Sequence, residues 1–423
     1  MKQSIKKNLF VITVISAIFL LVSCGIFDNS DDNTLTIIGK KNDLEKSYII
    51  SIFDRYREAT GNKLNIISFE DSEYETETLK RFQNGKGSDI FMHFHNSDLY
   101  SFDVENNFLY LNDEEWVDDL TDSARNYCTD KNGNLLGLPF WESSVSGCYY
   151  NKTLLAEMGL KPAATQAEFD VLCQAIAATG YTPICRPTVY SWMIQFAMDP
   201  IFADNPELLE KLNNNEISYS DIPEMIEMVK WVENAADKGW FGYNYTEKGW
   251  DDISDDMSSG KAVMTFIWDT WFYTDFEKGN KYSTDDFALM PVFLNTAHRG
   301  TYEGGNMNMM MVNKNSKKLD LALDFLAFCA SEENYNAAFD GIPTVSCFKG
   351  QTTNIQSKQV TDAAASIAEN ERVSTAASRI AGYSADDVTA AFDSLFRKKT
   401  DAAGCLKLMD DYRIEKASKQ EKQ

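Results

Sequence analysis

The chain lacks most of the residue patterns that carry catalytic chemistry. It has only three histidines and no two cysteines in C-x-x-C spacing, which removes the usual zinc and thiol-redox arrangements. His93 and His95 can share one face of a strand, but His298 is the only other histidine, and two imidazoles do not make a metal site without carboxylates nearby. The sequence also has no G-x-S-x-G motif, no Walker-type loop and no tandem repeat of fixed period. We therefore expect no metal, no cofactor and neither a solenoid nor a propeller.

Basic residues are scarce relative to acidic ones. The 40 Lys and Arg against 64 Asp and Glu give a formal charge of −24. Residues 1–23 hold three lysines and no acids, so their removal changes the formal charge from −24 to −27. Such a surface argues against nucleic acid and against adsorption to anionic lipid, and it is compatible with neutral or cationic ligands. Aromatic residues make up 13% of the chain, a good supply for binding surfaces.

No apolar run reaches the ~20 residues that a membrane span needs. Residues 9–22 are apolar except for Thr13 and Ser16, and three lysines precede them, which is the order of a secretory signal. The ending Leu-Val-Ser-Cys-Gly resembles the bacterial lipobox. This resemblance implies a signal peptide over 1–23, acyl chains such as palmitate on Cys24, and a polar tether over 24–33. An uncleaved anchor or a plain secretory signal is the alternative, and each places the globular part outside the cytoplasm.

Seven cysteines follow Cys24. Because seven is an odd number, at least one of them is unpaired in a monomer. Most are flanked by apolar or small residues, the setting of a buried small hydrophobe. We expect free thiols, with a Cys173–Cys185 pair as the alternative.

Strand and helix patterns alternate along the first part of the chain. Strands are predicted at 35–38, 64–67 and 89–94, and helices at 44–56, ended by Gly61, and at 73–82, ended by Gly85. This alternation is typical of a mostly parallel sheet with helices on both faces. The ~390 residues after the tether exceed what one core usually supports, so two α/β lobes are expected.

The same pattern returns further along. Thr165 and Glu168 form a capping box for a helix to 178, and Pro223 suits the first turn of a helix to 237. Strands are predicted at 181–185, 261–267, 287–292 and 307–312. After Lys318 the pattern is almost wholly helical, with helices at 318–330, 332–339, 360–380, 384–397 and 400–416.

Four stretches, in order, resemble the extracellular sugar-binding proteins of bacterial ABC importers, the maltose-binding-like family 1. They are 87–91 with 95–98; 136–144 with 149–152 and 157–160; 259–264 with 267–271; and 304–305 with 313–316, 331–333 and 341–343. The resemblance covers 34–415 and implies two lobes joined by a hinge, with the ligand between them. It places one lobe at 34–142 plus 304–332, the other at 143–303 plus 333–415, and a polar tail at 416–423. It also implies a monomer that delivers its solute to permease subunits.

The resemblance also implies where ligand is held. A sugar needs flat aromatic platforms together with carboxylates, amides and arginines that reach its hydroxyls. Carried over position by position, the candidates are His95, Asn96, Ser97, Trp141, Glu142, Trp268, Asp269, Trp271, Gly304, Gly305 and Asn306, with Glu70, Arg186 and Tyr190 as weaker ones. Ser68 and Phe69 accompany Glu70. Trp240 and Trp250 are better explained as core or hinge packing.

Two other classes of protein remain open. An exported glycosidase or lyase needs two carboxylates ~5–10 Å apart, which 64 acids cannot exclude by composition. A glycan adhesin would share the aromatic platforms but would need no hinge. Within the binding class, peptides, polyamines and glycerol phosphates remain alternatives to a sugar.

Overall fold

The computed structural model describes residues 33–130, 132–142, 144–185, 193–276, 281–294, 300–304, 307–342, 344, 346–352 and 356–420. The predicted signal peptide, Cys24 and most of the tether lie outside these residues. Within them the strands form two sheets, and the buried side chains form two clusters. We call the cluster within 35–141 and 307–348 the first core, and the cluster within 145–302 and 360–409 the second core.

The first sheet has the strand order β2-β1-β3-β10-β4. Its strands are β1 (Thr34–Lys40), β2 (Lys63–Phe69), β3 (Ile90–Phe94), β4 (Leu138–Pro139) and β10 (Asn308–Val312). β1 and β3 are parallel, as the alternating pattern predicts, whereas β10 runs antiparallel to both β3 and β4. β10 is buried at every position, including three consecutive methionines, as expected for a strand covered on both faces.

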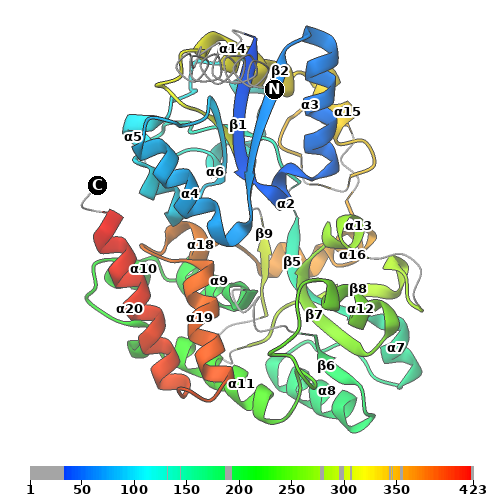
Figure 1. The fold of residues 1–423 in the computed structure, drawn as a ribbon. Coiled ribbons are helices and arrows are strands. Elements are labelled where there is room, and N and C mark those ends of the chain that lie inside the picture. The colour runs from blue at the N-terminus through cyan, green and yellow to red at the C-terminus, as the bar shows by residue number, and fades with distance from the viewer. Residues whose placement is uncertain are drawn as a thin grey trace, which may run out of the picture. The chain divides into compact units, whose positions relative to one another are not determined.

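The helices around this sheet bury one apolar stripe each. In α3 (Ser47–Thr60) the buried residues are Tyr48, Ile49, Ile52, Phe53 and Tyr56, and Gly61 ends the helix with φ +72°. Figure 1 shows α3 beside α15, on the opposite side of the sheet from α4 and α5. The other elements of this group are α2 (Lys41–Leu44), α4 (Asp71–Gln83), η1 (Ser97–Phe102), α5 (Val104–Asn107), η2 (Glu115–Asp119), α6 (Asp122–Tyr127), α14 (Leu319–Ala330) and α15 (Glu332–Ala338).

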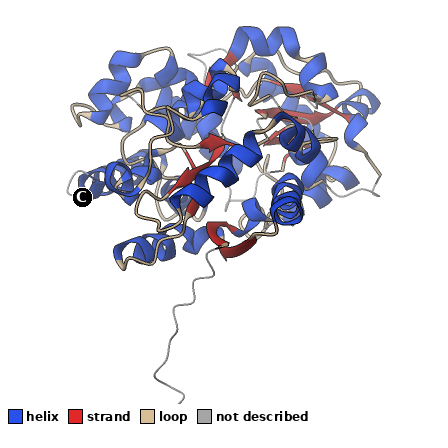
Figure 2. Ribbon diagram, turned by 90° about the horizontal axis from the view of Figure 1, so that it is seen from above, coloured by secondary structure: helices blue, strands red, loops and turns tan. Residues whose placement is uncertain are grey.

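The second sheet has the order β11-β9-β5-β7-β6, and β8 also pairs with β5. Its strands are β5 (Val145–Asn151), β6 (Thr182–Ile184), β7 (Ala262–Trp268), β8 (Phe287–Met290), β9 (Tyr302–Gly304) and β11 (Glu371–Val373). β6 is parallel to β7 and β11 is parallel to β9, while β5 is antiparallel to β7, β8 and β9. The fold is therefore α/β with two mixed sheets, and Figure 2 shows helices packed around the strands of both.

The second group of helices matches most of the sequence prediction. Thr165 caps α8 by accepting a hydrogen bond from the Glu168 N–H, and Pro223 opens α11. The elements are α7 (Lys152–Glu157), α8 (Gln166–Ala178), α9 (Gln195–Ala203), α10 (Pro206–Asn213), η4 (Tyr219–Asp221), α11 (Pro223–Asp237), α12 (Asp251–Ser259), α13 (Trp271–Thr274), η5 (Thr284–Asp286), α16 (Lys358–Asp362), α17 (Ala364–Asn370), α18 (Thr375–Arg379), α19 (Ala385–Phe396) and α20 (Ala402–Gln420).

The single helix predicted over 360–380 is wrong. The segment instead forms α16, α17, β11 and α18. β11 pairs in parallel with β9, so hydrogen bonding to a strand almost 70 residues earlier outweighs a local alanine-rich helical pattern. The predicted tail at 416–423 also changes, because α20 continues to Gln420.

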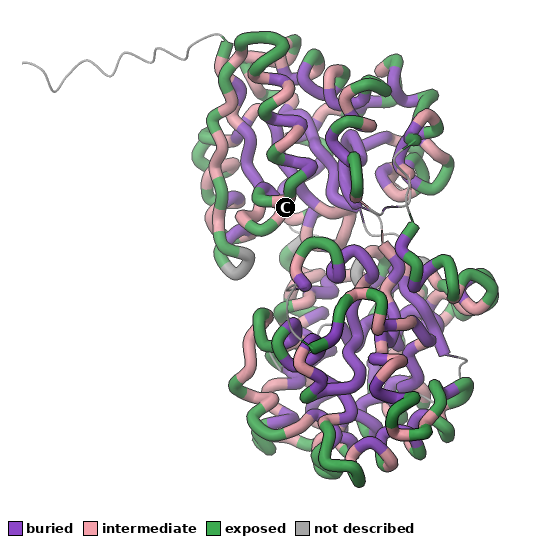
Figure 3. The backbone as a smooth tube through the Cα atoms, turned by 90° about the vertical axis from the view of Figure 1, so that its right-hand side faces the viewer, coloured by how far each residue is buried: buried purple, intermediate pink, exposed green. Residues whose placement is uncertain are grey.

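Judged from the described residues, the chain passes between the two cores at three places. Two lie between β4 and β5 and between β9 and β10. The third comes later than the boundary expected after residue 332, because Tyr335, Phe339 and Phe348 are buried in the first core. Figure 3 shows the buried segments inside each group and exposed ones along the outer helices.

Two further features bear on the predictions. All seven cysteines within the described residues are buried and free, so Cys173 and Cys185 are not paired. Across the same residues, every helix is either too short or too polar to span a bilayer.

Candidate functional site

Three side chains form one row across the second sheet, at the end of the strands nearest the crossings. Ser146 of β5 is directly opposite Trp268 of β7 on one side and Glu303 of β9 on the other. Directly opposite residues of antiparallel strands point to the same face, so Trp268, Ser146 and Glu303 share a face. The row joins an aromatic ring, a hydroxyl and a carboxylate, groups of the kind that bind polyols. Trp268 and Ser146 are partly exposed, whereas the Glu303 side chain is buried.

Trp268 is partly exposed and stacks on Trp250, with ring centroids 5.6 Å apart and planes at 27°. Trp250 Nε1 donates to Asp275 Oδ1 at 3.4 Å. Trp250 was expected to pack in the core or hinge, and its ring packs against the ring of Trp268. The two tryptophans form a platform at the end of β7.

Asp269 follows Trp268 and holds the start of β5. Its Oδ1 accepts a hydrogen bond from the Val145 N–H at 3.0 Å. Burial raises the pKa of Asp269 to about 6, although the Val145 N–H bond acts in the opposite direction. The Asp269 carboxylate therefore fixes the backbone where the chain enters the second sheet.

Trp141 and Glu142 lie in the first crossing, and both are buried. The Trp141 ring meets Tyr48 and Phe94 edge-on, at centroid distances of 5.8 and 5.2 Å. Glu142 Oε1 lies 3.2 Å from Lys46 Nζ. Trp141 thus packs against the first core, and Glu142 faces a cation from the same core.

Lys46 is held by two carboxylates that come from different parts of the fold. It precedes α3 in the first core, and its Nζ lies 3.2 Å from Glu142 and 3.7 Å from Asp275 of the second group. Burial opposes the charge on Lys46, but the two carboxylates outweigh it and its pKa is raised. Burial raises the pKa of Glu142, and Lys46 counteracts this. Lys46 therefore links the first core, the crossing and the second core.

His95, Asn96 and Ser97 follow β3, and each has a defined partner. His95 Nδ1 donates to the Tyr127 carbonyl at 2.5 Å, and its Nε2 lies 2.9 Å from the Tyr100 hydroxyl. Burial lowers the pKa of His95, so the ring is neutral and accepts from Tyr100. Asn96 accepts from the Leu99 N–H as the cap of η1, so its side-chain oxygen stabilises the start of that helix.

A polar chain runs from Glu303 to the first core. Gln195 Nε2 donates to both Glu303 oxygens at 3.1 and 3.3 Å, and Gln195 Oε1 accepts from the Tyr383 hydroxyl at 2.8 Å. Ser97 Oγ donates to the Tyr383 carbonyl. Ser97 belongs to η1 and Tyr383 to the second core, so this chain is a second link between the groups.

Asp199 lies one helical turn after Gln195 in α9. Its Oδ1 accepts from the N–H groups of Thr375 and Ala376, at 2.8 and 2.9 Å. Burial raises the pKa of Asp199, and the charge of Glu303 and hydrogen bonding to the Glu303 carboxyl raise it further.

The sequence analysis missed Lys46, Gln195, Asp199, Tyr383 and Glu303. One signal was present: Gln195 and Asp199 are polar residues four apart in the otherwise apolar segment 194–203. That spacing puts both on one face of a helix, and buried polar side chains need partners. Nothing local marks Lys46 or Glu303, because their partners lie far away in sequence.

Several predicted site residues lie elsewhere. Trp271 is fully buried in the second core against Phe272 and Phe276, which indicates a packing role and disfavours the predicted stacking on ligand. Glu70 is exposed and pairs with Lys41 at 2.8 Å, away from the row, with Ser68 and Phe69 just before it in β2. Gly304 ends β9, where an added Cβ would lie 1.9 Å from Glu371 Oε1. Arg186, Tyr190, Gly305 and Asn306 lie outside the described residues.

The histidine pair considered for zinc has a different role. His93 Nδ1 faces the Phe94 carbonyl at 2.7 Å and Nε2 faces Glu75 Oε1 at 3.0 Å. Both partners only accept, so both ring nitrogens donate and the ring is an imidazolium. Burial opposes this charge, but Glu75 outweighs it and raises the pKa of His93. No cluster of three potential metal ligands occurs among the described residues.

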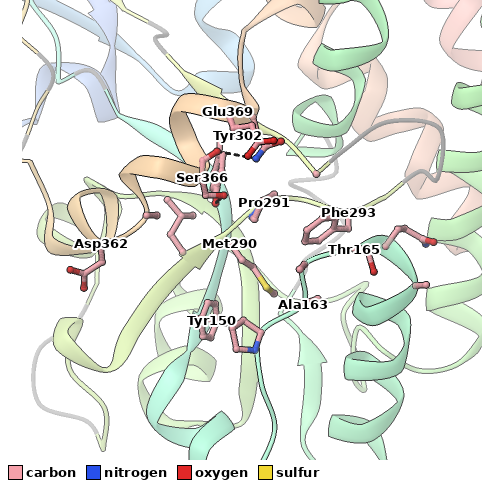
Figure 4. A pocket seen from close by; sticks show the side chains of 18 residues that line it. Tyr150, Ala163, Thr165, Met290, Pro291, Phe293, Tyr302, Asp362, Ser366 and Glu369 are labelled. Carbon is pink, nitrogen blue, oxygen red and sulfur yellow. Dashed lines mark hydrogen bonds between the residues drawn. The ribbon is translucent and has the colours of Figure 1, made fainter.

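A separate cavity of about 890 Å³ opens on the second lobe. Figure 4 shows Tyr150, Met290 and Phe293 on its walls, with Ser366 bonded to the Tyr302 hydroxyl at its rim. None of the predicted ligand residues lines it, and all its lining residues come from the second group of elements.

The family model described as bacterial extracellular solute-binding protein matches residues 42–336. Comparison with curated protein sequences gives no match. Among solved structures, the chain is similar to a chitin oligosaccharide binding protein, with TM-score 0.76, 19% identity and coverage of 91% of this chain and 99% of that one. It is also similar to RafE in complex with raffinose (TM-score 0.74, 17% identity, 91% and 99% coverage) and to sugar transporter BL01359 of Bacillus licheniformis in complex with stachyose (TM-score 0.72, 18% identity, 91% and 100% coverage).

Proposed function

Since the chain belongs to the bacterial extracellular solute-binding protein family, we propose that it captures an oligosaccharide outside the cytoplasm and delivers it to an ABC permease. The observation that carries the choice of a sugar is the row of Trp268, Ser146 and Glu303, which offers a ring face, a hydroxyl and a carboxylate on one side of the sheet. The three similar structures named above, a chitin oligosaccharide binding protein and two proteins in complex with raffinose and stachyose, support the same ligand class.

The links between the two cores suggest how binding is signalled. Lys46 joins the cores on one side, and Ser97 with Tyr383 joins them on the other. A ligand that contacts both lobes stabilises the arrangement in which the lobes lie together. It can shift the equilibrium towards this arrangement only by as much as it binds this arrangement more tightly than the other one. A permease that recognises this arrangement would receive loaded receptors in preference to empty ones. No catalytic role for the chain is part of this proposal.

Membrane attachment is proposed to depend on Cys24 alone. The Cys24→Ser variant is expected to leave the membrane fraction, because the two or three acyl chains provide the anchoring and the acidic surface provides none. Fractionation of cells measures this, and ligand affinity of the released protein should equal that of the anchored form. Retention of Cys24→Ser on membranes would contradict the lipid anchor, and Cys405→Ser serves as a matched control that should stay attached.

The ligand class is tested by thermal unfolding of residues 25–423 against mono- and oligosaccharides, with peptides and polyamines beside them. A ligand that binds only the native state stabilises it by RT ln(1 + [L]/Kd), so Tm rises with the logarithm of the ligand concentration once that concentration exceeds Kd. We expect selective stabilisation by an oligosaccharide, which is recovered chemically unchanged. Stabilisation by a peptide or polyamine alone would keep the receptor and discard the sugar, and cleavage of the sugar would identify a hydrolase.

A further inference from the structure

We propose that Asp275 is a positioning residue that ties the platform of Trp250 and Trp268 to the first lobe, so that the placement of the lobes affects how the two rings pack. The two oxygens of the Asp275 carboxylate have partners in different lobes. The tie is a property of the ligand-free protein, and only its effect on ligand affinity rests on the proposed function.

One oxygen of Asp275 serves the platform. Trp250 Nε1 donates to Asp275 Oδ1 at 3.4 Å, and the Trp250 ring stacks on Trp268 with centroids 5.6 Å apart. An indole has a single N–H, which lies in the plane of the ring, so its acceptor restricts the directions in which the ring can lie. Asp275 thereby helps to hold the Trp250 ring in the orientation that supports Trp268.

The other oxygen of Asp275 faces the first lobe. Lys46 Nζ lies 3.7 Å from Asp275 Oδ2, which also accepts from the Thr274 hydroxyl. The Lys46 side chain is 16% exposed and that of Asp275 is 31% exposed, so solvent screens this pair less than a surface ion pair. Burial opposes the charge on Lys46, but Glu142 and Asp275 outweigh it and raise its pKa. Lys46 therefore stays charged and attracts Asp275 from the opposite lobe.

This arrangement gives the platform a contact path to the first lobe. When Lys46 moves away with its lobe, Asp275 loses one of its restraints, and Trp250 is then held by a looser acceptor. A ligand that steadies Trp268 on Trp250 in turn favours the position of Asp275 that meets Lys46. Such coupling is reciprocal, so the lobes and the platform must affect each other by the same factor.

The ligand-free test measures the exciton band that two stacked indoles give in circular dichroism. Trp250 and Trp268 form one such pair, and Trp231 and Trp240 form another with centroids 5.9 Å apart. Trp250→Phe removes the first pair alone, so its difference from the wild-type spectrum defines the platform band. Below Tm this band reports on ring packing in the folded protein, which a change of stability by itself does not alter.

Lys46→Met is expected to lose part of the platform band, although Lys46 belongs to the other lobe and pairs with neither indole. Asp275→Asn keeps an acceptor for Trp250 but no charge for Lys46, so it should lose a similar part, and Asp275→Ala should lose more. Asp393→Asn is the matched control that should keep the band, because Asp393 is 33% exposed and its cation, Arg397, lies on the same helix. A wild-type band in folded Lys46→Met would overturn the tie.

Titration of residues 25–423 with the stabilising oligosaccharide tests the effect on binding. We expect Lys46→Met and Trp250→Phe each to weaken binding by ~5-fold or more, and the double variant to weaken it by less than the product of the two factors. Changes at separate sites without a shared partner usually add in free energy, whereas these two residues share Asp275. Fully additive losses would overturn the coupling to ligand. Failure of the wild-type protein to bind any saccharide would overturn the proposed function and leave the ligand-free result standing.

Discussion

Trp271→Ala is expected to lower the free energy of unfolding by ~3–5 kcal/mol and to leave the ligand affinity of the folded protein unchanged. Trp271 is fully buried, and its ring packs against Phe272 and Phe276 at centroid distances of 5.0 and 5.4 Å. Truncation removes the largest side chain of this cluster and leaves a cavity that the surrounding rings can fill only partly. Urea unfolding followed by tryptophan fluorescence and circular dichroism measures the change.

Trp268→Ala is the matched comparison, three residues earlier. Trp268 is partly exposed and rests on Trp250, so its loss should cost less stability and more affinity. The two variants therefore separate packing from binding. A Trp271→Ala protein that keeps its stability but loses its ligand would contradict the placement of Trp271 in the core.

Lys46→Met is expected to lower the free energy of unfolding by roughly 3 kcal/mol, because it leaves the Glu142 carboxylate buried without its cation. Methionine keeps most of the volume of the lysine side chain, so the change reports on charge. Burial already raises the pKa of Glu142, and removal of Lys46 raises it further. An acid whose pKa is higher in the folded state costs stability above its unfolded pKa, so the deficit should shrink as the pH falls from neutral to mildly acidic.

Two further variants test this interpretation of Lys46. Lys41→Met removes an exposed lysine that pairs with exposed Glu70, and it should leave stability near that of the wild-type protein. The double variant Lys46→Met with Glu142→Gln should recover part of the loss, because no unpaired buried charge remains. A double variant no more stable than Lys46→Met alone would show that the loss comes from packing.

The sequence predicts most of the elements because each of them carries a complete local signal. The helix ended by Gly61 and the helix capped by Thr165 have their apolar spacing and their end residues within a few positions. Among the strands that the sequence predicts, β7 and β10 are almost wholly apolar runs. Residues 360–380 lack any local mark of β11, since that strand exists only through its pairing with β9.

The site is less predictable because its groups meet only in the folded chain. Lys46, Glu142 and Asp275 are brought together from three separate segments, and Ser97 and Tyr383 from two others. The resemblance identified Trp268 and Asp269 at the end of a strand, but it could not distinguish Trp268 from Trp271, which point into different surroundings. Glu303 was adjacent to a predicted glycine pair and was still missed, because its importance depends on strand register.

The proposed function requires an oligosaccharide to bind at the row that contains Trp268. Equilibrium titration of residues 25–423 with the stabilising oligosaccharide, on the wild-type protein and on Trp268→Ala, is the decisive experiment. We expect one ligand per wild-type chain, recovered intact, and an affinity weakened by ~10-fold or more in Trp268→Ala. Saturable binding of the same sugar with equal affinity in both proteins would contradict the assignment of the row, and no binding to either would contradict the function.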